Sequence, residues 1–145
     1  MLTQKFRMFS LARVAASVAL LTVGLTSAAL ASSGVGVTAN PQVGNILVDE
    51  RGMTLYRLTT DQPNVSTCYD SCARAWPPVL VDAIPLAQDA TLSAGLGSAP
   101  RTDGTQQLTF QGAPLYSYIG DSQPGDITGQ ASDGVWFVVN PAAPN

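Results

Sequence analysis

The chain has 145 residues and a formal net charge of −3, with ten acidic residues, seven basic residues and no histidine. Without imidazole there is no Ser–His or Cys–His nucleophile pair, no histidine proton shuttle near neutral pH, and no histidine-ligated zinc or c-type haem. The composition therefore excludes most familiar hydrolase and metalloenzyme designs. We expect no catalytic residue, no metal site and no cofactor, and we favour a protein that is not an enzyme.

The first 31 residues have the pattern of a signal peptide that is removed on export. They begin with three basic residues, Lys5, Arg7 and Arg13. An apolar stretch follows over residues 14–25, and a small-x-small cleavage site ends at Ala31. This stretch is shorter than the roughly 20 apolar residues of a membrane span. Ser32, not a cysteine, follows the cleavage site, so no lipid is expected there. The pattern predicts a secreted or periplasmic protein with no stable membrane span after cleavage.

The exported part would carry a more negative charge than the whole chain. Cleavage removes three of the seven basic residues, leaving four arginines against ten acids, a net charge of −6 with no lysine. Nucleic acids are not expected as partners, because phosphate neutralisation needs a basic patch. Residues 32–42 are small and polar and are expected to be a flexible leader. A single β domain over residues 43–141 and a tail over residues 142–145 would follow.

Two segments have the pattern of β-hairpins. Residues 45–49 and 53–59 are rich in apolar and β-favouring side chains on either side of the turn Glu50-Arg51-Gly52. Residues 108–119 repeat this pattern around the turn Gln111-Gly112, and residues 135–139 predict a late strand. The many prolines and glycines suit short strands joined by tight loops. The fold expected from these patterns is all-β and mainly antiparallel.

One short helix is expected between the hairpins. Thr67 and Asp70 have the spacing of a capping box, and residues 68–75 can continue as helix until Trp76-Pro77-Pro78 ends it. Residues 81–95 show no clear period. They are expected to connect the two halves of the domain, with room for a short helical turn.

Cys68 and Cys72 are the two cysteines of the chain, four residues apart within the expected helix. In an exported protein this spacing predicts a local disulfide, since the Cα atoms of residues i and i+4 of a helix lie within bridging distance. A redox-active or copper-binding thiol pair is the functional alternative, because thiolates suit soft metals.

Part of the sequence occurs twice. Residues 52–61 return as residues 112–121 with Gly, Leu, Tyr and Asp at the same places, and Trp76 returns as Trp136 at the same offset of 60. An internal repeat of this kind indicates the architecture of the fold more directly than any single residue does. It predicts two hairpin-based units, over about residues 43–80 and 103–140, related by an approximate internal two-fold axis. Trp76 and Trp136 are expected to pack in the core or between the units.

The repeated Tyr and Asp residues have two readings. Tyr56, Tyr116 and Tyr118 would lie on strands, whereas Asp61 and Asp121, five residues after a Tyr, would lie beyond the strand at a turn. Asp beside Pro and Gly is ordinary turn chemistry, so the motif first predicts a structural role. The alternative is a site where the hydroxyls and carboxylates of both repeats converge on a ligand.

An acidic, glycine-rich loop over residues 121–133 is a third candidate site. Its oxygen-bearing side chains are of the kind that bind calcium, yet their spacing does not match an EF-hand loop and no terminal Glu is present. We therefore expect these side chains to be solvent-exposed turn residues.

The order of these elements resembles a bacterial family of secreted or lipoprotein repeats defined by a Tyr-x-(Phe/Trp/Tyr)-x-x-Asp motif. The resemblance rests on Leu47-Val-Asp49, Gly52-x-x-Leu-Tyr56, Asp61, Cys68-x-x-x-Cys72-Ala73, Trp76-Pro-Pro78, Leu96-Gly97, Arg101-x-Asp-Gly104, Gly112-x-Pro-Leu-Tyr116, Asp121, Pro124-Gly125, Gly129-Gln130 and Trp136. The second copy fits the motif fully, whereas the first has Leu58 where an aromatic residue is expected. The resemblance implies the cell envelope as the working place and carries no catalytic assignment.

Two functions from different classes remain open. The first is a non-enzymatic envelope module that binds or packs against an unidentified envelope component through Tyr56, Asp61, Tyr116, Tyr118 and Asp121. The alternative is a thiol-disulfide or electron-transfer accessory that uses Cys68 and Cys72. The sequence does not indicate an oligomeric state.

Overall fold

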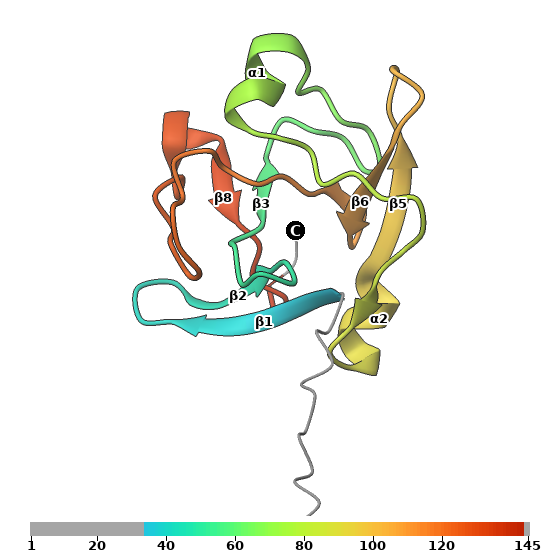
Figure 1. Cartoon of the computed structure of the whole chain (residues 1–145). Coiled ribbons are helices and arrows are strands. Elements are labelled where there is room, and N and C mark those ends of the chain that lie inside the picture. The colour runs from blue at the N-terminus through green and yellow to red at the C-terminus, as the bar shows by residue number, and fades with distance from the viewer. Residues whose placement is uncertain (1–33, 144–145) are drawn as a thin grey trace, which may run out of the picture.

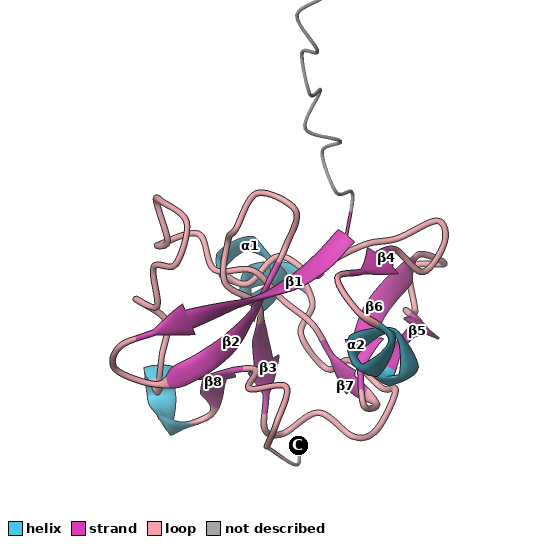
Figure 2. Ribbon diagram, turned by 90° about the horizontal axis from the view of Figure 1, so that it is seen from below, coloured by secondary structure: helices cyan, strands magenta, loops and turns pink. Residues whose placement is uncertain are grey.

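The computed structural model of the protein describes residues 34–143, which fold mainly as short antiparallel strands joined by loops (Figures 1 and 2). The strands are β1 (Gly34–Asn40), β2 (Gly44–Val48), β3 (Tyr56–Leu58), β4 (Leu86–Ala87), β5 (Leu96–Pro100), β6 (Gln106–Phe110), β7 (Ala113–Pro114) and β8 (Trp136–Val138). The helices are α1 (Asp70–Ala75), α2 (Ala90–Gly95) and the 3₁₀ turn η1 (Ser132–Gly134). The expected fold class is confirmed, and α2 is a second short helix in the connecting segment. The predicted signal peptide, residues 1–31, lies outside the described residues.

The strands form three small sheets, ordered β2-β1-β4, β3-β8 and β5-β6-β7. All strand pairs are antiparallel except β1 with β4. Isolated bridges join these sheets into a continuous structure: Val48 pairs with Thr54, Tyr56 with Tyr116, and Leu80 with Gln107. In Figure 1, β1, β2, β3 and β8 lie on one side, β5 and β6 on the other.

The N-terminal segment is ordered, contrary to the expectation of a flexible leader over residues 32–42. Residues 34–40 form β1, which pairs along its length with β2, from Gly36 opposite Val48 to Asn40 opposite Gly44. Small and polar residues suit this strand because its end lies at the surface, whereas Val35 is buried in the core. Composition alone did not reveal the partner strand that orders this segment.

Both predicted hairpins are confirmed, with turns of different length. In the first, Asp49 N–H donates to Met53 O and Gly52 N–H donates to Asp49 O, each at 2.9 Å. In the second, β6 and β7 turn directly at Gln111-Gly112, with Phe110 opposite Ala113. Gly52 and Gly112 have φ values of +80° and +83°, a left-handed conformation that glycine adopts without steric cost. Each hairpin therefore turns at a glycine.

The last extended segment of each repeat forms backbone hydrogen bonds with the other repeat. Residues 75–79 of the first repeat run along residues 115–119, with Val79 N–H donating to Leu115 O at 3.0 Å and Ser117 N–H to Pro77 O at 2.9 Å. Residues 135–139 of the second repeat run in the same way along residues 55–59, with Val139 N–H donating to Leu55 O at 3.0 Å. A sequence repeat is therefore not a spatial unit, since each repeat completes the other.

The helix α1 begins differently from the prediction. No side chain caps its first turn, and the Thr67 hydroxyl donates to the Asp61 carboxylate instead. The predicted capping box is therefore wrong, because a tertiary partner uses the Thr67 side chain. The helix ends where expected, at Trp76, whose N–H donates to Cys72 O at 2.8 Å.

The core has two apolar clusters. One gathers aliphatic side chains from both hairpins, including Leu47, Leu55, Leu108 and Leu115. The other holds the aromatic residues of the repeats, Tyr56, Trp76, Tyr116 and Trp136. Each cluster contains residues of both repeats, because the last segment of each repeat pairs with the other repeat.

Candidate functional site

The repeated tyrosines meet at the centre of the molecule. Tyr56 N–H donates to Tyr116 O at 2.8 Å, and Tyr116 N–H donates to Tyr56 O at 2.9 Å. This reciprocal pair places the approximate two-fold axis between the two residues. Both side chains are fully buried, at 0% exposure.

Each tyrosine is bonded to the aspartate of the other repeat. The Tyr56 hydroxyl donates to Asp121 Oδ2 at 2.7 Å, and the Tyr116 hydroxyl donates to Asp61 Oδ2 at 2.6 Å. We call these four residues the crossed Tyr–Asp pairs. The motif thus joins Tyr to Asp between repeats, which the spacing within one repeat did not reveal.

The second oxygen of each aspartate organises a loop. Asp61 Oδ1 accepts hydrogen bonds from the N–H and hydroxyl of Thr67, at 2.8 and 2.6 Å. Asp121 Oδ1 accepts the corresponding pair from Thr128, at 2.9 and 2.5 Å. Both carboxylates are therefore fully engaged by the protein. Neither has the unbonded oxygen that a nucleophile or general base would present.

The phenols are held in their neutral form. Burial, together with the hydrogen bond to Asp121, raises the pKa of Tyr56 well above its usual value. Burial and the bond to Asp61 raise the pKa of Tyr116 in the same way. A tyrosine that resists ionisation is a poor proton acceptor near neutral pH, so the crossed Tyr–Asp pairs have the character of structural hydrogen bonds.

An aromatic stack crosses the axis beside these pairs. The rings of Trp76 and Trp136 are parallel within 5°, with centroids 4.0 Å apart. Tyr118 stacks on the other face of Trp76 with centroids 4.1 Å apart. The packing of Trp76 and Trp136 between the repeats is as predicted. Leu58, at the place of Tyr118 in the first repeat, packs against the same cluster without extending the stack.

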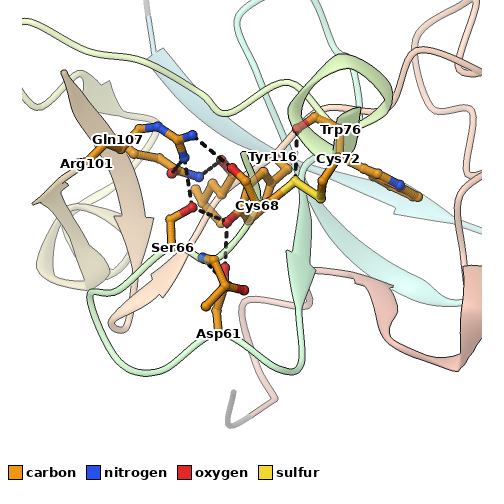
Figure 3. Close-up of a disulfide and its surroundings, with 10 residues drawn as sticks. Asp61, Ser66, Cys68, Cys72, Trp76, Arg101, Gln107 and Tyr116 are labelled. Carbon is orange, nitrogen blue, oxygen red and sulfur yellow. Dashed lines mark hydrogen bonds between the residues drawn. A yellow bond between two sulfur atoms is a disulfide. The ribbon is translucent and has the colours of Figure 1, made fainter. Parts of the chain in front are cut away.

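A buried arginine supports one of the crossed pairs (Figure 3). Arg101 Nη1 donates to Ser66 Oγ and to Gln107 Oε1, both at 2.7 Å, and Ser66 Oγ lies 2.7 Å from the Tyr116 hydroxyl. Because a guanidinium only donates and a carboxylate only accepts, the chain of hydrogen bonds runs from Arg101 through Ser66 and Tyr116 to Asp61. In the other pair, the Tyr56 hydroxyl accepts a hydrogen bond from a single backbone donor, Gly129 N–H, at 3.3 Å.

Sequence reasoning did not single out Arg101 or Ser66 as site residues. A lone arginine between polar residues gives no periodic signal, and its burial depends on the loop that carries Cys68. Arg101 Nη2 donates to Cys68 O at 2.8 Å, and its guanidinium lies over the ring of Tyr69, 4.2 Å from the centroid. The arginine thus anchors the loop that leads into α1.

The predicted disulfide between Cys68 and Cys72 is present, with Cα atoms 5.3 Å apart. Cys68 is fully buried, whereas Cys72 lies within α1 and is partly exposed. In Figure 3 the bridge lies next to Trp76 and on the side of Cys68 opposite Arg101. An external thiolate could therefore approach the bridge only through Cys72.

The aspartates line two separate shallow clefts. One, of about 380 Å³, is bordered by Arg51, Ser117, Tyr118 and Asp121. The other, of about 230 Å³, is bordered by Arg57, Leu58, Asp61 and Gln111. The approximate two-fold axis relates them, since most of their lining residues correspond at the offset of 60. The two carboxylates therefore do not converge on one ligand.

The acidic loop over residues 121–133 is organised by its own hydrogen bonds. Asp126 Oδ2 accepts from the N–H groups of Ser122 and Gln123, at 2.9 and 3.0 Å. These bonds lower the pKa of the Asp126 carboxyl. Within residues 34–143 no group of three or more acidic or cysteine side chains is arranged to hold a metal ion.

An apolar groove lies between the two sides of the molecule. It has a volume of about 680 Å³. Its walls are formed by Val35 of β1, by Leu55 and Leu108 of the two hairpins and by Val79, and its edge by residues 80, 81 and 83–86. Three side chains of that edge, Leu80, Ile84 and Leu86, are 51%, 52% and 79% exposed. We call this hollow, with the segment 80–86, the apolar groove.

The charged side chains that line the groove are Asp49, Glu50 and Arg51. Asp49 binds Arg51 through two hydrogen bonds, at 3.1 and 2.8 Å, so this pair is neutral. Glu50, between them in the turn, and Asp82, in the exposed edge, have no ion-pair partner among the described residues. Of these two carboxylates, Glu50 lines the groove, whereas Asp82 lies in the exposed segment without lining it.

Neither α1 nor α2 has the length or apolar character of a membrane-spanning helix, and the rest of residues 34–143 contains no such helix. No curated protein and no solved structure matches the chain. A family model described as a secreted repeat of unknown function matches residues 37–80 and again residues 97–140. These two matches are offset by 60 residues, as the internal repeat is, and together they cover more than half of the chain. The chain therefore belongs to this family of secreted repeats.

Proposed function

We propose that this protein is an exported cell-envelope module that binds a polypeptide through the apolar groove and catalyses no reaction. The signal-peptide pattern of residues 1–31 supports export into the periplasm or the medium. In this proposal the crossed Tyr–Asp pairs are structural, and they hold the two sides of the groove in fixed positions.

The proposal rests on the exposed apolar side chains that lie together at the edge of the groove. The five large apolar side chains exposed among residues 34–143 are Val65, Leu80, Ile84, Leu86 and Ile119. Three of these five lie at the edge of the groove, next to walls that are themselves apolar. A concave apolar surface with exposed apolar edges is typical of a protein interaction site.

The other candidate sites are less suited to binding. Both aspartates of the crossed pairs are occupied by Thr and Tyr donors, and the clefts beside them are smaller than the apolar groove. The thiol-disulfide accessory is the second candidate, because the partly exposed Cys72 offers one sulfur to an external thiolate.

The proposal is tested with the purified exported protein and a neutral, fluorescent peptide of alternating leucine and serine. We expect binding that weakens about tenfold or more when Leu80→Ser and Ile84→Ser are combined, because two apolar contacts are lost. The matched control is Val65→Ser with Ile119→Ser. These side chains are at least as exposed, at 52% and 66%, but lie outside the groove. Equal binding by both double variants, or no binding by the parent protein, would refute the proposal.

A further inference from the structure

We infer that the stacked aromatic rings and Tyr56 form a one-electron redox site, which gives an electron to a small oxidant through Tyr118 and keeps the resulting radical on Tyr56. The chemical class of the partner is a one-electron oxidant, such as an oxygen-derived radical. This inference goes beyond binding in the apolar groove and does not depend on it. It adds a role to one of the crossed Tyr–Asp pairs.

The stack consists of side chains that lose a single electron readily. Indoles and phenols are oxidised by one electron more easily than other aromatic or aliphatic side chains. Trp76 lies between Trp136 and Tyr118, with ring centroids 4.0 and 4.1 Å away. Rings stacked at this distance share a positive charge, which stabilises the oxidised form. An electron removed at one end of the stack can therefore be replaced from the other rings.

Tyr118 connects the stack to solvent. Trp76 and Trp136 are 5% and 4% exposed, so they offer little surface to an oxidant in solution. Tyr118 is partly exposed and borders the cleft of about 380 Å³ beside Asp121. A small oxidant in this cleft therefore meets the outer ring of the stack first.

Tyr56 can supply an electron to the stack because its proton has an acceptor. A phenol that loses an electron becomes a strong acid, so the loss is favourable when the proton leaves at the same time. The Tyr56 hydroxyl donates to Asp121 Oδ2 at 2.7 Å, which is within the reach that proton transfer requires. The ring of Tyr56 lies edge-on to Trp76, with centroids 5.3 Å apart. The proton moves along this existing hydrogen bond, so no unbonded carboxylate oxygen is needed.

Each oxidation removes one electron from the protein and no proton. The oxidant takes the electron from Trp76 through Tyr118, which leaves a radical cation on the indole. Tyr56 then gives an electron to the indole and its hydroxyl proton to Asp121, so that Tyr56 becomes a neutral radical and Asp121 a neutral acid. A reductant of the enediol or thiol class restores the site by supplying one electron, and Asp121 returns the proton to Tyr56.

The two crossed Tyr–Asp pairs differ in charge, and the difference favours Tyr56. Arg101 Nη1 donates to Ser66 Oγ, which lies 2.7 Å from the Tyr116 hydroxyl. A buried positive charge opposes removal of an electron from Tyr116, because charges interact strongly away from water. The ion pair of Arg101 with the exposed Asp103, at 3.5 Å, offsets this charge only in part. The Tyr56 hydroxyl is bonded instead by a carboxylate and one backbone N–H.

The test is pulse radiolysis of the purified exported protein with azide radical, a small one-electron oxidant, followed by transient absorption. We expect the absorption of a tryptophan radical to be replaced by that of a tyrosyl radical at a rate independent of protein concentration. This replacement should slow in deuterium oxide, because a proton moves with the electron. Ascorbate should reduce the tyrosyl radical more slowly than the radical of N-acetyltyrosinamide, since Tyr56 is 0% exposed.

Matched variants of the two repeats identify the tyrosine. Tyr56→Phe should lose the slowly reduced tyrosyl radical, whereas Tyr116→Phe, at the corresponding place, should retain it. Asp121→Asn should slow formation of the radical, whereas Asp61→Asn should not, because an amide oxygen accepts a hydrogen bond but is a weak proton acceptor. Tyr118→Leu, which copies the first repeat, should slow the initial oxidation by removing the outer ring.

Several outcomes would overturn the inference. In the parent protein these are a tyrosyl radical that ascorbate reduces as fast as the free derivative, or a replacement rate that deuterium oxide leaves unchanged. Both results are independent of how well a variant folds. Equal loss of the radical in Tyr56→Phe and Tyr116→Phe would overturn the assignment to Tyr56. Leu80→Ser with Ile84→Ser should leave the radical unchanged, because neither residue borders the cleft of Tyr118, so the proposed binding and this redox site can fail separately.

Discussion

Tyr56 is bonded to Asp121, 65 residues away, and not to Asp61 at the end of its own motif. The two copies of the motif are therefore interdependent. Double-mutant cycles measure this arrangement. Tyr56→Phe and Asp121→Ala should show a coupling of about 1–3 kcal/mol in the free energy of unfolding, as for a buried hydrogen bond to a charged group. The matched cycle of Tyr56→Phe with Asp61→Ala should be additive within about 0.5 kcal/mol. Urea denaturation provides the measurement, and a larger coupling within the repeat would contradict the crossed pairs.

Alkaline pH should unfold the protein through its buried phenols. The pKa of Tyr56 and of Tyr116 is raised on folding, so above about pH 10 the unfolded state loses protons first. The stability that these residues contribute is fully present below about pH 10 and is lost as the pH rises through their folded pKa. Each should contribute a fall of about 1.4 kcal/mol per pH unit over that interval.

Tyr56→Phe should therefore make the alkaline fall in stability about half as steep. Tyr69→Phe is the control, because a hydrogen bond from Thr102 lowers the pKa of the partly exposed Tyr69. Urea denaturation at several pH values gives the slopes. An unchanged slope in Tyr56→Phe, or Tyr56 ionising without unfolding in an absorbance titration, would show that burial does not hold the phenol neutral.

Gly129 lies against the indole of Trp76, and this contact requires a residue without a side chain. A Cβ at residue 129 would lie 2.5 Å from Trp76 Cη2 and 2.9 Å from Cζ3. Gly129→Ala should therefore destabilise the protein by about 1–3 kcal/mol and weaken its near-ultraviolet circular dichroism. Trp76→Phe removes both clashing atoms, so in that background the same substitution should cost less. An equal cost in both backgrounds would contradict this explanation.

The disulfide should be a stable structural bridge. Closing so short a loop stabilises by about 2 kcal/mol, so a double variant with both Cys68→Ala and Cys72→Ala should unfold at correspondingly lower denaturant. As a structural bridge, the disulfide should have a reduction potential below about −300 mV in a glutathione titration. A higher potential together with an unaffected fold on reduction would favour the thiol-disulfide accessory.

The chain should tolerate a break between its repeats. Residues 82–84 are exposed and form no backbone hydrogen bond with other described residues, and they lie outside both exchanged segments, residues 75–79 and 135–139. A protease site inserted between Ala83 and Ile84 and cut after folding should leave one particle that contains both fragments, observed by native mass spectrometry. The same site inserted between Trp136 and Phe137, within β8, should resist cutting while the protein is folded. Separation of the fragments after the first cut would contradict the interlocked arrangement.

The hairpins, the late strand and the disulfide could be predicted because their signals are local. Gly52 and Gly112 mark turns, and alternating apolar residues mark the strands beside them. The partners of Tyr56 and Arg101 could not be predicted in this way, since each depends on a contact made 33 or more residues away. For the same reason β1 was expected to be flexible, and Thr67 was assigned to a helix cap although its hydroxyl binds Asp61.

The exchanged strands give the chain the form of a homodimer whose two subunits have become covalently joined. In a homodimer every substitution occurs in both subunits, so a surface cannot change in one subunit alone. Fusion removes this constraint. It allows Leu58 to stand opposite Tyr118, and Gly129 to bond Tyr56 where Arg101 and Ser66 support Tyr116. The apolar groove has as its edge the segment that links the two repeats, so it is a surface that the covalently joined form can possess and two separate subunits cannot.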